Sequence, residues 1–264
     1  MRSSPVIHRS LSDEGVIEIV QDGDIRSLYF GSDAKQSSMD ILQPERLVLS
    51  YTQMMMASLI FAPLPQNILL IGLGGGSLAK FLLHLFPGCH IDAVEFRHDV
   101  VKLAHGYFCV PENKQLTIHI GDGFDYLNSN KAKGREYDHI FVDAFNHDGV
   151  ADSIKQMSFF YACHDKLSRN GVLNINLWNH KEDMYTHTMD CLENAFRQNV
   201  LTLPVKDKGN VITLATREEK EPQKFKTLKA TAQQLEAQSN LPYGTYLRQL
   251  RRHNRWRKLS KLFI

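Results

Sequence analysis

The residues best placed for chemistry are a glycine-rich loop and three acids, each of which lies at the end of an apolar segment. The loop, Gly72–Gly76, has four glycines in five positions, and the acids are Glu95, Asp122 and Asp143. Ligands of parallel α/β sheets bind outside the carboxyl ends of the strands, so these four positions are expected to meet at one cleft. A single acid at a strand end would mean little, but the whole series predicts a cofactor site.

The chemistry of these groups favours an adenosyl cofactor. The Glu95 carboxylate can accept hydrogen bonds from both hydroxyls of a ribose, and Asp122, beside Gly123, can accept one from the exocyclic amine of adenine. The glycine loop would lie against the amino-acid end of the ligand, with Asp143 near the reactive centre. Because the loop reads GLGGG rather than GxGxxG, S-adenosylmethionine or a relative fits better than NAD.

A strand–loop–helix–strand unit positions the glycine loop. Asn67–Ile71 reads NILLI, which is too short and too aliphatic for an amphipathic helix and therefore predicts a buried strand. Ser77–Phe86 has apolar residues at helical spacing and ends at Pro87-Gly88. His90–Val94 predicts the next strand. Since Glu95 follows the glycines by roughly 20 residues, this is the βαβ geometry that binds nucleoside-containing cofactors.

The rest of the chain continues the alternation of strands and helices. Further strands are predicted over Leu116–Ile120, Tyr137–Val142, Val172–Trp178, Val200–Val205 and Asn210–Thr216. Helices are predicted over Asp99–Tyr107, Phe124–Leu127, Ser153–Leu167 and Glu182–Phe196. This order predicts an α/β fold with a doubly wound, Rossmann-like sheet of the S-adenosylmethionine-dependent methyltransferase type, whose last two strands form an antiparallel hairpin.

A small β-segment precedes this sheet. Met1–Ser12 is polar and is expected to be loose. Val16–Gln21 and Ile25–Phe30 alternate apolar and polar residues around an Asp-Gly-Asp turn, which predicts a hairpin. Gly31–Asp40 is rich in turn-forming residues. We therefore predict an N-terminal β-hairpin region over residues 1–43.

Two further regions complete the predicted organisation. A helix is expected from Pro44, a residue that suits the first helical turn, to about Ile60. This helix opens an adenosyl-cofactor domain over residues 44–220. Residues 221–264 are expected to form a C-terminal helix, Gln223–Gln238, and a basic tail.

The net charge of +2 conceals an asymmetry. The last 19 residues, 246–264, contain seven Lys and Arg residues and no acid, which leaves 24 basic and 29 acidic residues in the body, a net charge of −5. The body is therefore not that of a nucleic-acid binder. A solvated terminal helix or a tail that covers a dimer partner is favoured for this segment, and a contact with RNA or an acidic partner is the alternative.

Composition also argues against other classes of protein. No segment approaches the roughly 18 uninterrupted apolar residues of a membrane span. The N-terminus has no basic-then-apolar leader, so we expect a cytoplasmic protein. The four cysteines form no CxxC pair and the histidines no HxH or HExxH, so we expect no metal site.

From about Val16 to Trp178, the chain resembles the spermidine synthase family, the polyamine aminopropyltransferases. Each motif alone is common among adenosylmethionine-binding folds, but together and in this order they are specific. The matching residues are Gln36 after the hairpin, Tyr51-Thr52-Gln53-Met54 in place of the family's Tyr-His-Glu-Met, the strand with its glycine loop, Val94-Glu95, Gly121-Asp122-Gly123, and YDHIFVDAF over Tyr137–Phe145.

The resemblance implies transfer of an aminopropyl group from decarboxylated S-adenosylmethionine to a small amine, with release of methylthioadenosine. A neutral amine would attack, in line, the methylene beside the sulfonium, and a carboxylate would orient and deprotonate that amine. Asp143 matches the first acid of the family's Asp-Ser-Thr-Asp-Pro loop and is therefore the expected base. Gln36 and the glycines Gly72, Gly74, Gly75 and Gly76 are expected to bind the co-substrate.

Several positions depart from the family's pattern. The family's glycine loop is GGGDG, and its aspartate, which binds the amine of the aminopropyl arm, aligns with Gly75. The second acid of the catalytic loop becomes Asn146, although Asp148 follows closely. Thr52 and Gln53 replace a histidine and a glutamate, and the proline- and tryptophan-bearing segment that walls the polyamine site is missing. A buried ammonium without its carboxylate costs on the order of 3–5 kcal/mol.

These departures leave three alternatives open: an aminopropyltransferase, an S-adenosylmethionine-dependent methyltransferase, and a non-catalytic nucleoside-binding protein. For either enzyme the expected co-substrate is decarboxylated or intact S-adenosylmethionine, and the expected assembly is a homodimer. Tyr51, Asn146, Asp148 and Trp178 are the candidates for binding the acceptor, although Trp178 could equally be structural.

Overall fold

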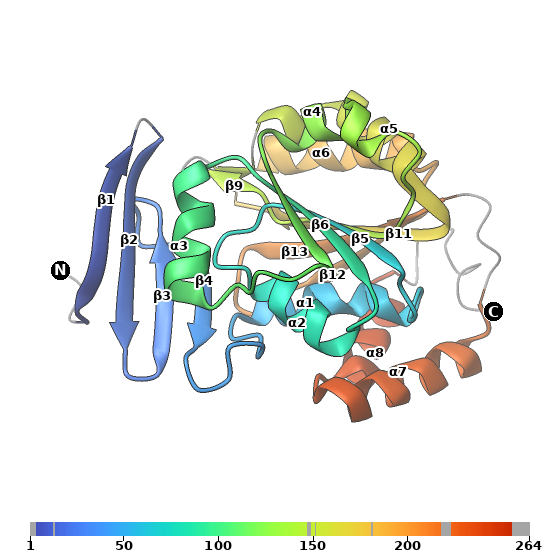
Figure 1. Cartoon of the computed structure of the whole chain (residues 1–264). Coiled ribbons are helices and arrows are strands. Elements are labelled where there is room, and N and C mark those ends of the chain that lie inside the picture. Colours follow the sequence, from blue (N-terminus) through green and yellow to red (C-terminus); the bar gives the residue numbers. More distant parts are fainter. Residues whose placement is uncertain are drawn as a thin grey trace.

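A seven-stranded sheet forms the centre of the molecule in the computed structural model (Figure 1). The structure describes residues 4–12, 14–146, 149–150, 152–180, 182–217 and 223–254, with the backbone alone at 145–146, 149–150 and 152. The strand order is β12-β13-β11-β8-β5-β6-β7. The strands are β5 (Asn67–Ile71), β6 (His90–Glu95), β7 (Leu116–Ile120), β8 (Tyr137–Val142), β11 (Leu167–Trp178), β12 (Val200–Pro204) and β13 (Asn210–Thr216).

The pairing of these strands confirms the doubly wound fold. β5 pairs in parallel with both β6 and β8, while β13 is antiparallel to β11 and to β12. The chain runs outward from β5 through β6 to β7 and then returns to the other side of β5 at β8. This reversal of direction between β5 and β8 is the switch point at which such sheets bind ligands.

Helices cover both faces of the sheet (Figure 1). On one face, buried side chains of α4, α5 and α6 share one core with β5, β8 and β11. On the other face, α1, α2, α7 and α8 pack together over the sheet. The bounds are α1 (Ser50–Met55), α2 (Ser77–Leu85), α3 (His98–Phe108), α4 (Gly123–Asn128), α5 (Met157–Lys166), α6 (Glu182–Ala195), α7 (Phe225–Ser239) and α8 (Tyr243–His253).

The N-terminal region is a four-stranded antiparallel sheet rather than a single hairpin. The expected hairpin is confirmed as β2 (Gly15–Asp22) and β3 (Ile25–Tyr29), which are flanked by β1 (Val6–Ser12) and β4 (Lys35–Asp40). The predictions of a loose Met1–Ser12 and a turn-rich Gly31–Asp40 are therefore wrong over these strands. β1 is a largely exposed edge strand, and β4 buries serines, so neither shows an apolar alternation.

The helix predicted from Pro44 begins later than expected. α1 starts at Ser50 and continues as a 3-10 helix over Met56–Ile60. Similarly, the predicted helix Ser153–Leu167 is divided into a 3-10 turn, Asp152–Lys155, and α5, because Gln156 between them has an extended backbone. It also ends before Leu167, which pairs with β8. In both cases the apolar pattern indicated helix correctly but not the position of its first turn.

The C-terminal region packs on the main core. α7 lies within a residue or two of its predicted bounds, but α8 was expected only as part of a basic tail. Buried Leu228 and Leu235 of α7 and Leu247 and Leu250 of α8 join the same cluster as the residues of α1 and α2. Among the described residues, no helix combines the length and apolar composition that a bilayer crossing requires.

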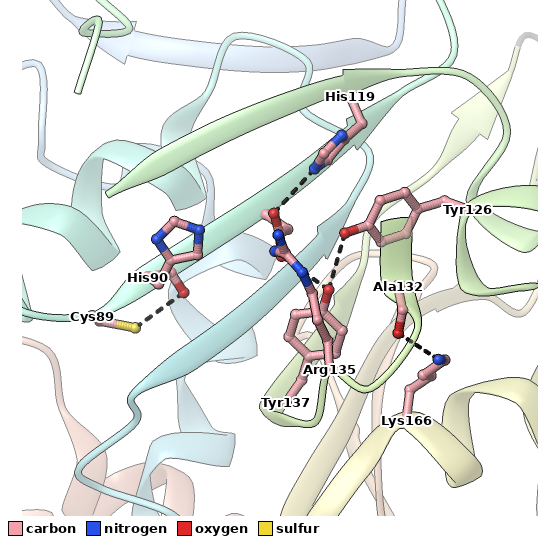
Figure 2. Close-up of polar contacts among 9 residues, drawn as sticks. Cys89, His90, His119, Tyr126, Ala132, Arg135, Tyr137 and Lys166 are labelled. Carbon is pink, nitrogen blue, oxygen red and sulfur yellow. Dashed lines mark hydrogen bonds and ion pairs between the residues drawn. The ribbon is translucent and has the colours of Figure 1, made fainter. Parts of the chain in front are cut away.

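A buried carboxylate, Asp92 of β6, ties the sheet to the segment before β8. It accepts hydrogen bonds from His119, at 3.0 Å, from Tyr137, at 2.9 Å, and from Arg135. Figure 2 shows the side chains of these three partners pointing toward one another. Burial raises the pKa of Asp92, but the hydrogen bonds outweigh it and hold that pKa below its ordinary value.

We expect Asp92→Asn to lower the free energy of unfolding at pH 7 by about 3 kcal/mol, because it removes the buried charge that accepts hydrogen bonds from Arg135, His119 and Tyr137. Since the folded-state pKa of Asp92 is depressed, this stability is present above the unfolded pKa of about 4 and is lost as the pH falls below it. Urea denaturation between pH 3 and pH 7 measures both effects. As a control, Asp165→Asn, with a side chain 81% exposed, should change stability by less than about 0.5 kcal/mol; an equal loss in both variants would contradict the prediction.

Candidate functional site

A cavity of about 780 Å³ lies at the carboxyl ends of β5, β6, β7 and β8. The N-terminal sheet supplies its opposite wall through Glu14, Gly15, Val16 and Phe30. This volume falls in the range of sites for cofactors and other small molecules. Of the predicted site residues, the structure brings together Gln36, Tyr51, Gly72, Gly74, Glu95, Asp122, Gly123 and Asp143 around the cavity.

Gly72 cannot be replaced by a larger residue without moving the backbone of the site. Its φ is +96°, and a Cβ built on it would lie 2.3 Å from the backbone oxygen of Asp143. The N–H of Asp143 also donates to the carbonyl of Ile71 at 2.9 Å. The loops after β5 and β8 are thus held in direct contact at the switch point.

Gly75 and Gly76 do not line the cavity. A Cβ at Gly75 would point to Ser37 Oγ, at 2.7 Å, and to the ring of Phe108, at 2.9 Å. A Cβ at Gly76 would lie 2.2 Å from Val110. These two glycines therefore allow the loop to pack against neighbouring side chains, and the space that a side chain at Gly75 would need is already occupied.

Glu95 is buried at the end of β6 and holds the glycine loop. Its Oε2 accepts hydrogen bonds from the N–H groups of Leu73 and Gly74, at 3.0 and 3.1 Å. Its Oε1 accepts one from the N–H of Arg97, at 3.0 Å. A carboxylate has about four acceptor positions, so one is left for a ligand hydroxyl.

Asp122 caps the first turn of α4. Its Oδ1 accepts from the N–H groups of Phe124, at 2.8 Å, and Asp125, at 3.1 Å. Its Oδ2 accepts from the hydroxyl of Ser153, at 2.7 Å, which connects α4 to the segment that precedes α5. The carboxylate that the sequence offers to adenine thus also stabilises the helix start beside the cavity.

Asp143 follows β8, with its carboxylate held by two donors. The hydroxyl of Tyr51 donates to Oδ2 at 3.1 Å, and the side-chain amide of Asn176 donates to Oδ1 at 3.0 Å. Desolvation raises the pKa of Asp143 to about 6, although both hydrogen bonds act to lower it. A carboxylate with this pKa can accept a proton at neutral pH.

Asn176 is itself held in one orientation. Its Oδ1 accepts a hydrogen bond from the side-chain amide of Asn210 on β13, at 3.0 Å, which leaves its own amide to donate to Asp143. Sequence reasoning missed Asn176 and Asn210. A signal for Asn176 was present in β11, where Asn174 and Asn176 interrupt an otherwise apolar run. Buried amides require hydrogen-bond partners, so their presence there indicated a polar contact.

Arg97 is a second residue that sequence reasoning missed. It is 7% exposed, lines the cavity, and lies over the ring of Phe30 at 4.9 Å. Its guanidinium donates to Ser12 Oγ, at 2.9 Å, and to the carbonyl of Gly15, at 3.2 Å. Arg97 thereby fastens the turn between β1 and β2 to the wall of the cavity.

Of the remaining predicted residues, Trp178 does not line the cavity. Trp178 is 38% exposed, and its ring lies edge-on to that of His180. Asn146 is described only as backbone of the short strand β9 (Phe145–Asn146), and Asp148 lies outside the described residues. Within the part of the chain that the structure describes, no group of three His, Cys, Asp or Glu side chains could hold a metal ion.

The chain is similar in sequence to known proteins. The Spermine/spermidine synthase domain family matches residues 48–229. A protein of Chromobacterium violaceum named polyamine aminopropyltransferase is 35% identical over 239 residues, which cover 90% of each chain.

Two solved structures are similar in fold. A probable spermidine synthase from Corynebacterium glutamicum aligns with a TM-score of 0.72 at 18% identity over 90% of each chain. Human Methyltransferase-like protein 13, solved in complex with SAH, aligns with a TM-score of 0.65 at 24% identity, over 76% of this chain and 93% of its own. At these identities the structural alignments speak for the fold alone. Together with the domain match and the sequence relative, they lead to one conclusion: the chain belongs to the spermine/spermidine synthase family.

Proposed function

We propose that this protein is a polyamine aminopropyltransferase, which transfers an aminopropyl group from decarboxylated S-adenosylmethionine to a small amine. Family membership supports the reaction class. The single observation that carries the assignment of the site is Asp143, a carboxylate held by Tyr51 and Asn176 at the cavity wall, with its pKa at about 6.

In the proposed reaction, the amine nitrogen attacks the methylene carbon beside the sulfonium. The new C–N bond forms as the C–S bond breaks, and methylthioadenosine leaves with the electron pair on sulfur. The nitrogen loses one proton, which Asp143 accepts. Tyr51 and Asn176 keep the Asp143 carboxylate facing the cavity, so the base is oriented before the amine arrives.

The co-substrate would lie along the strand ends. We propose that Glu95 binds the ribose, that Asp122 and Gly123 bind the adenine, and that Gln36, Gly72 and Gly74 face the sulfonium end. Glu95 contributes a carboxylate to the cavity, Asp122 caps the helix start at its edge, and Gly123 contributes backbone. Gly75 and Gly76 would act through the shape of the loop. We propose that Tyr51 also touches the acceptor, which is supported by its position in the cavity lining beside Asp143. Asn146, Asp148 and Trp178 remain predictions from the sequence.

Titration calorimetry and product analysis test the proposal. We expect decarboxylated S-adenosylmethionine to bind at least tenfold more tightly than intact S-adenosylmethionine, and methylthioadenosine to be released only when a small diamine is added. Methyl transfer from the intact co-substrate would show that the protein is a methyltransferase. Absence of binding by either compound would overturn the proposal in favour of a non-catalytic protein.

Asn210→Ala should lower kcat about three- to tenfold, because it releases the amide of Asn176 from the orientation that serves Asp143. The pH at which activity is half-maximal should also rise, since Asp143 loses part of a hydrogen bond that lowers its pKa. If Asn210 had only a structural role, its replacement would not change the pH of half-maximal activity. Asn128→Ala is the matched control: Asn128 is exposed and donates only to the carbonyl of Phe124 in its own helix. An unchanged pH profile for Asn210→Ala would contradict the positioning role.

We further propose that the protein works as a homodimer in the cytoplasm. The support for self-association is the exposed edge strand β1, on which Val6 is 48% and Leu11 is 78% exposed. An unpaired edge strand can pair with a second chain. Sedimentation velocity should give twice the mass of one chain, and Leu11→Lys should shift the protein toward the monomer. A monomer for the unaltered protein would refute the dimer.

A further inference from the structure

A second cavity is lined by residues of α7 and α8. Its volume is about 730 Å³, and none of its lining residues is shared with the cavity at the strand ends. The proposed reaction makes no use of it.

Four cationic side chains line this groove. Lys229 of α7 and Arg248, Arg251 and Arg252 of α8 line it, with Glu236 as the single carboxylate among its lining residues. Two of the three arginines are held in place. The guanidinium of Arg251 lies 4.4 Å from the centre of the Phe225 ring, and Arg248 donates to Thr245 Oγ1 at 2.8 Å. Cations fixed in this way lose less entropy when they bind an anion.

The packing of the two helices forces these cations outward. Leu228 and Leu235 of α7 and Leu247 and Leu250 of α8 are buried in the main core. The charged stripes lie on the opposite sides of the same helices, and Arg248, Arg251 and Arg252 are all exposed. The groove is therefore a fixed feature of the fold.

The distribution of charge along the chain points to an anionic partner. From Ala237 to the last residue the sequence contains seven Lys and Arg residues and no acid, whereas the remainder has more acidic than basic residues. Of these seven, Arg248, Arg251 and Arg252 belong to the described residues and line the groove, so a polyanion is attracted to the groove.

We propose that the groove between α7 and α8 binds the phosphate backbone of single-stranded nucleic acid. Guanidinium groups match phosphate in a bidentate geometry, and all three cations on α8 are arginines rather than lysines. A run of fixed cations along a groove is the feature that tracks a single strand. Adsorption to an anionic membrane fits less well, because the apolar face of α8 is buried in the core and cannot insert into lipid.

Fluorescence anisotropy with a labelled oligouridine of 20 nucleotides tests the proposal on the full chain. The double variant Arg248→Gln/Arg252→Gln should bind about tenfold more weakly at 100 mM KCl. The slope of log K against log [KCl] should become shallower by about 1.4, because each phosphate of a single strand that the protein no longer neutralises reduces the slope by about 0.7. Both residues are exposed, so the fold and the aminopropyl transfer should be unchanged.

The matched control is Lys131→Gln/Lys133→Gln, which removes the same charge from two exposed lysines near the end of α4. It should leave the affinity and the salt slope within about twofold of the unaltered protein. If both double variants weakened oligonucleotide binding equally, the effect would come from net charge alone, and the proposal would be overturned. Unchanged binding in the arginine variant, tighter binding to vesicles of anionic lipid than to the oligonucleotide, or no binding at all would also overturn it. None of these outcomes bears on the proposed transfer reaction, which is assayed separately.

Discussion

Asp143→Asn is expected to lower kcat by about 10²–10⁴, the usual contribution of a positioned general base. The amide has the shape of the carboxylate but cannot take the proton from the attacking amine. It also cannot accept from both Tyr51 and Asn176, the two donors that hold the carboxylate. Initial rates of methylthioadenosine release at saturating co-substrate and amine measure the effect.

Binding separates this loss of catalysis from loss of fold. Asp143→Asn should bind methylthioadenosine within about threefold of the unaltered protein, because the groups proposed for ribose and adenine are untouched. The control Asp125→Asn changes an exposed acid on α4 and should keep full activity. A decrease in kcat of less than tenfold for Asp143→Asn would show that another group takes the proton.

The pKa of Asp143 also predicts the dependence on pH. Activity should fall tenfold per pH unit below about 6, as the carboxylate becomes protonated. Because the folded-state pKa is raised, the folded protein binds this proton more tightly than the unfolded chain does. Stability is therefore lost as the pH rises from about 4 to about 6. At pH 7 the free energy of unfolding of Asp143→Asn should be about 1–2 kcal/mol higher than that of the unaltered protein. Initial rates and urea denaturation across this pH range should therefore show activity rising and the free energy of unfolding falling as the pH passes about 6.

Glu95→Gln is expected to raise the KM for the co-substrate by about 10- to 100-fold, with kcat reduced less than about threefold. Hydrogen bonds to a charged group contribute about 1.5–3 kcal/mol each, and Glu95 accepts three of them from the backbone around the cavity. The amide can replace only part of this set, so the glycine loop loosens where the ribose would bind. Steady-state kinetics over a range of co-substrate concentrations separates KM from kcat.

Glu112→Gln, which alters an exposed acid in the segment between α3 and β7, is the control for Glu95→Gln and should leave both constants unchanged. The two predictions distinguish the two acids of the cavity: Glu95→Gln should mainly raise KM, and Asp143→Asn should mainly lower kcat. If Glu95→Gln mainly reduced kcat, the assignment of Glu95 to the ribose would have to be abandoned.

The central sheet was predictable from the sequence, because strands buried on both faces read as short continuous apolar runs. β5, β7, β8 and β13 have the bounds that the sequence predicts. The placement of Glu95, Asp122 and Asp143 around one cavity follows from the same fact, since parallel strands end at the same edge. Local pattern was less informative where elements pair through polar residues, as in β1 and β4.

Only the tertiary structure decided what each of these acids touches. Asn176 donates to Asp143 from β11, and Asn210 of β13 donates to Asn176; no spacing rule connects these three residues. The raised pKa of Asp143 depends on desolvation by residues from several elements, which a linear sequence does not display. The type and order of the chemical groups are local properties of the chain, whereas their orientation and protonation are set by contacts between segments that meet only on folding.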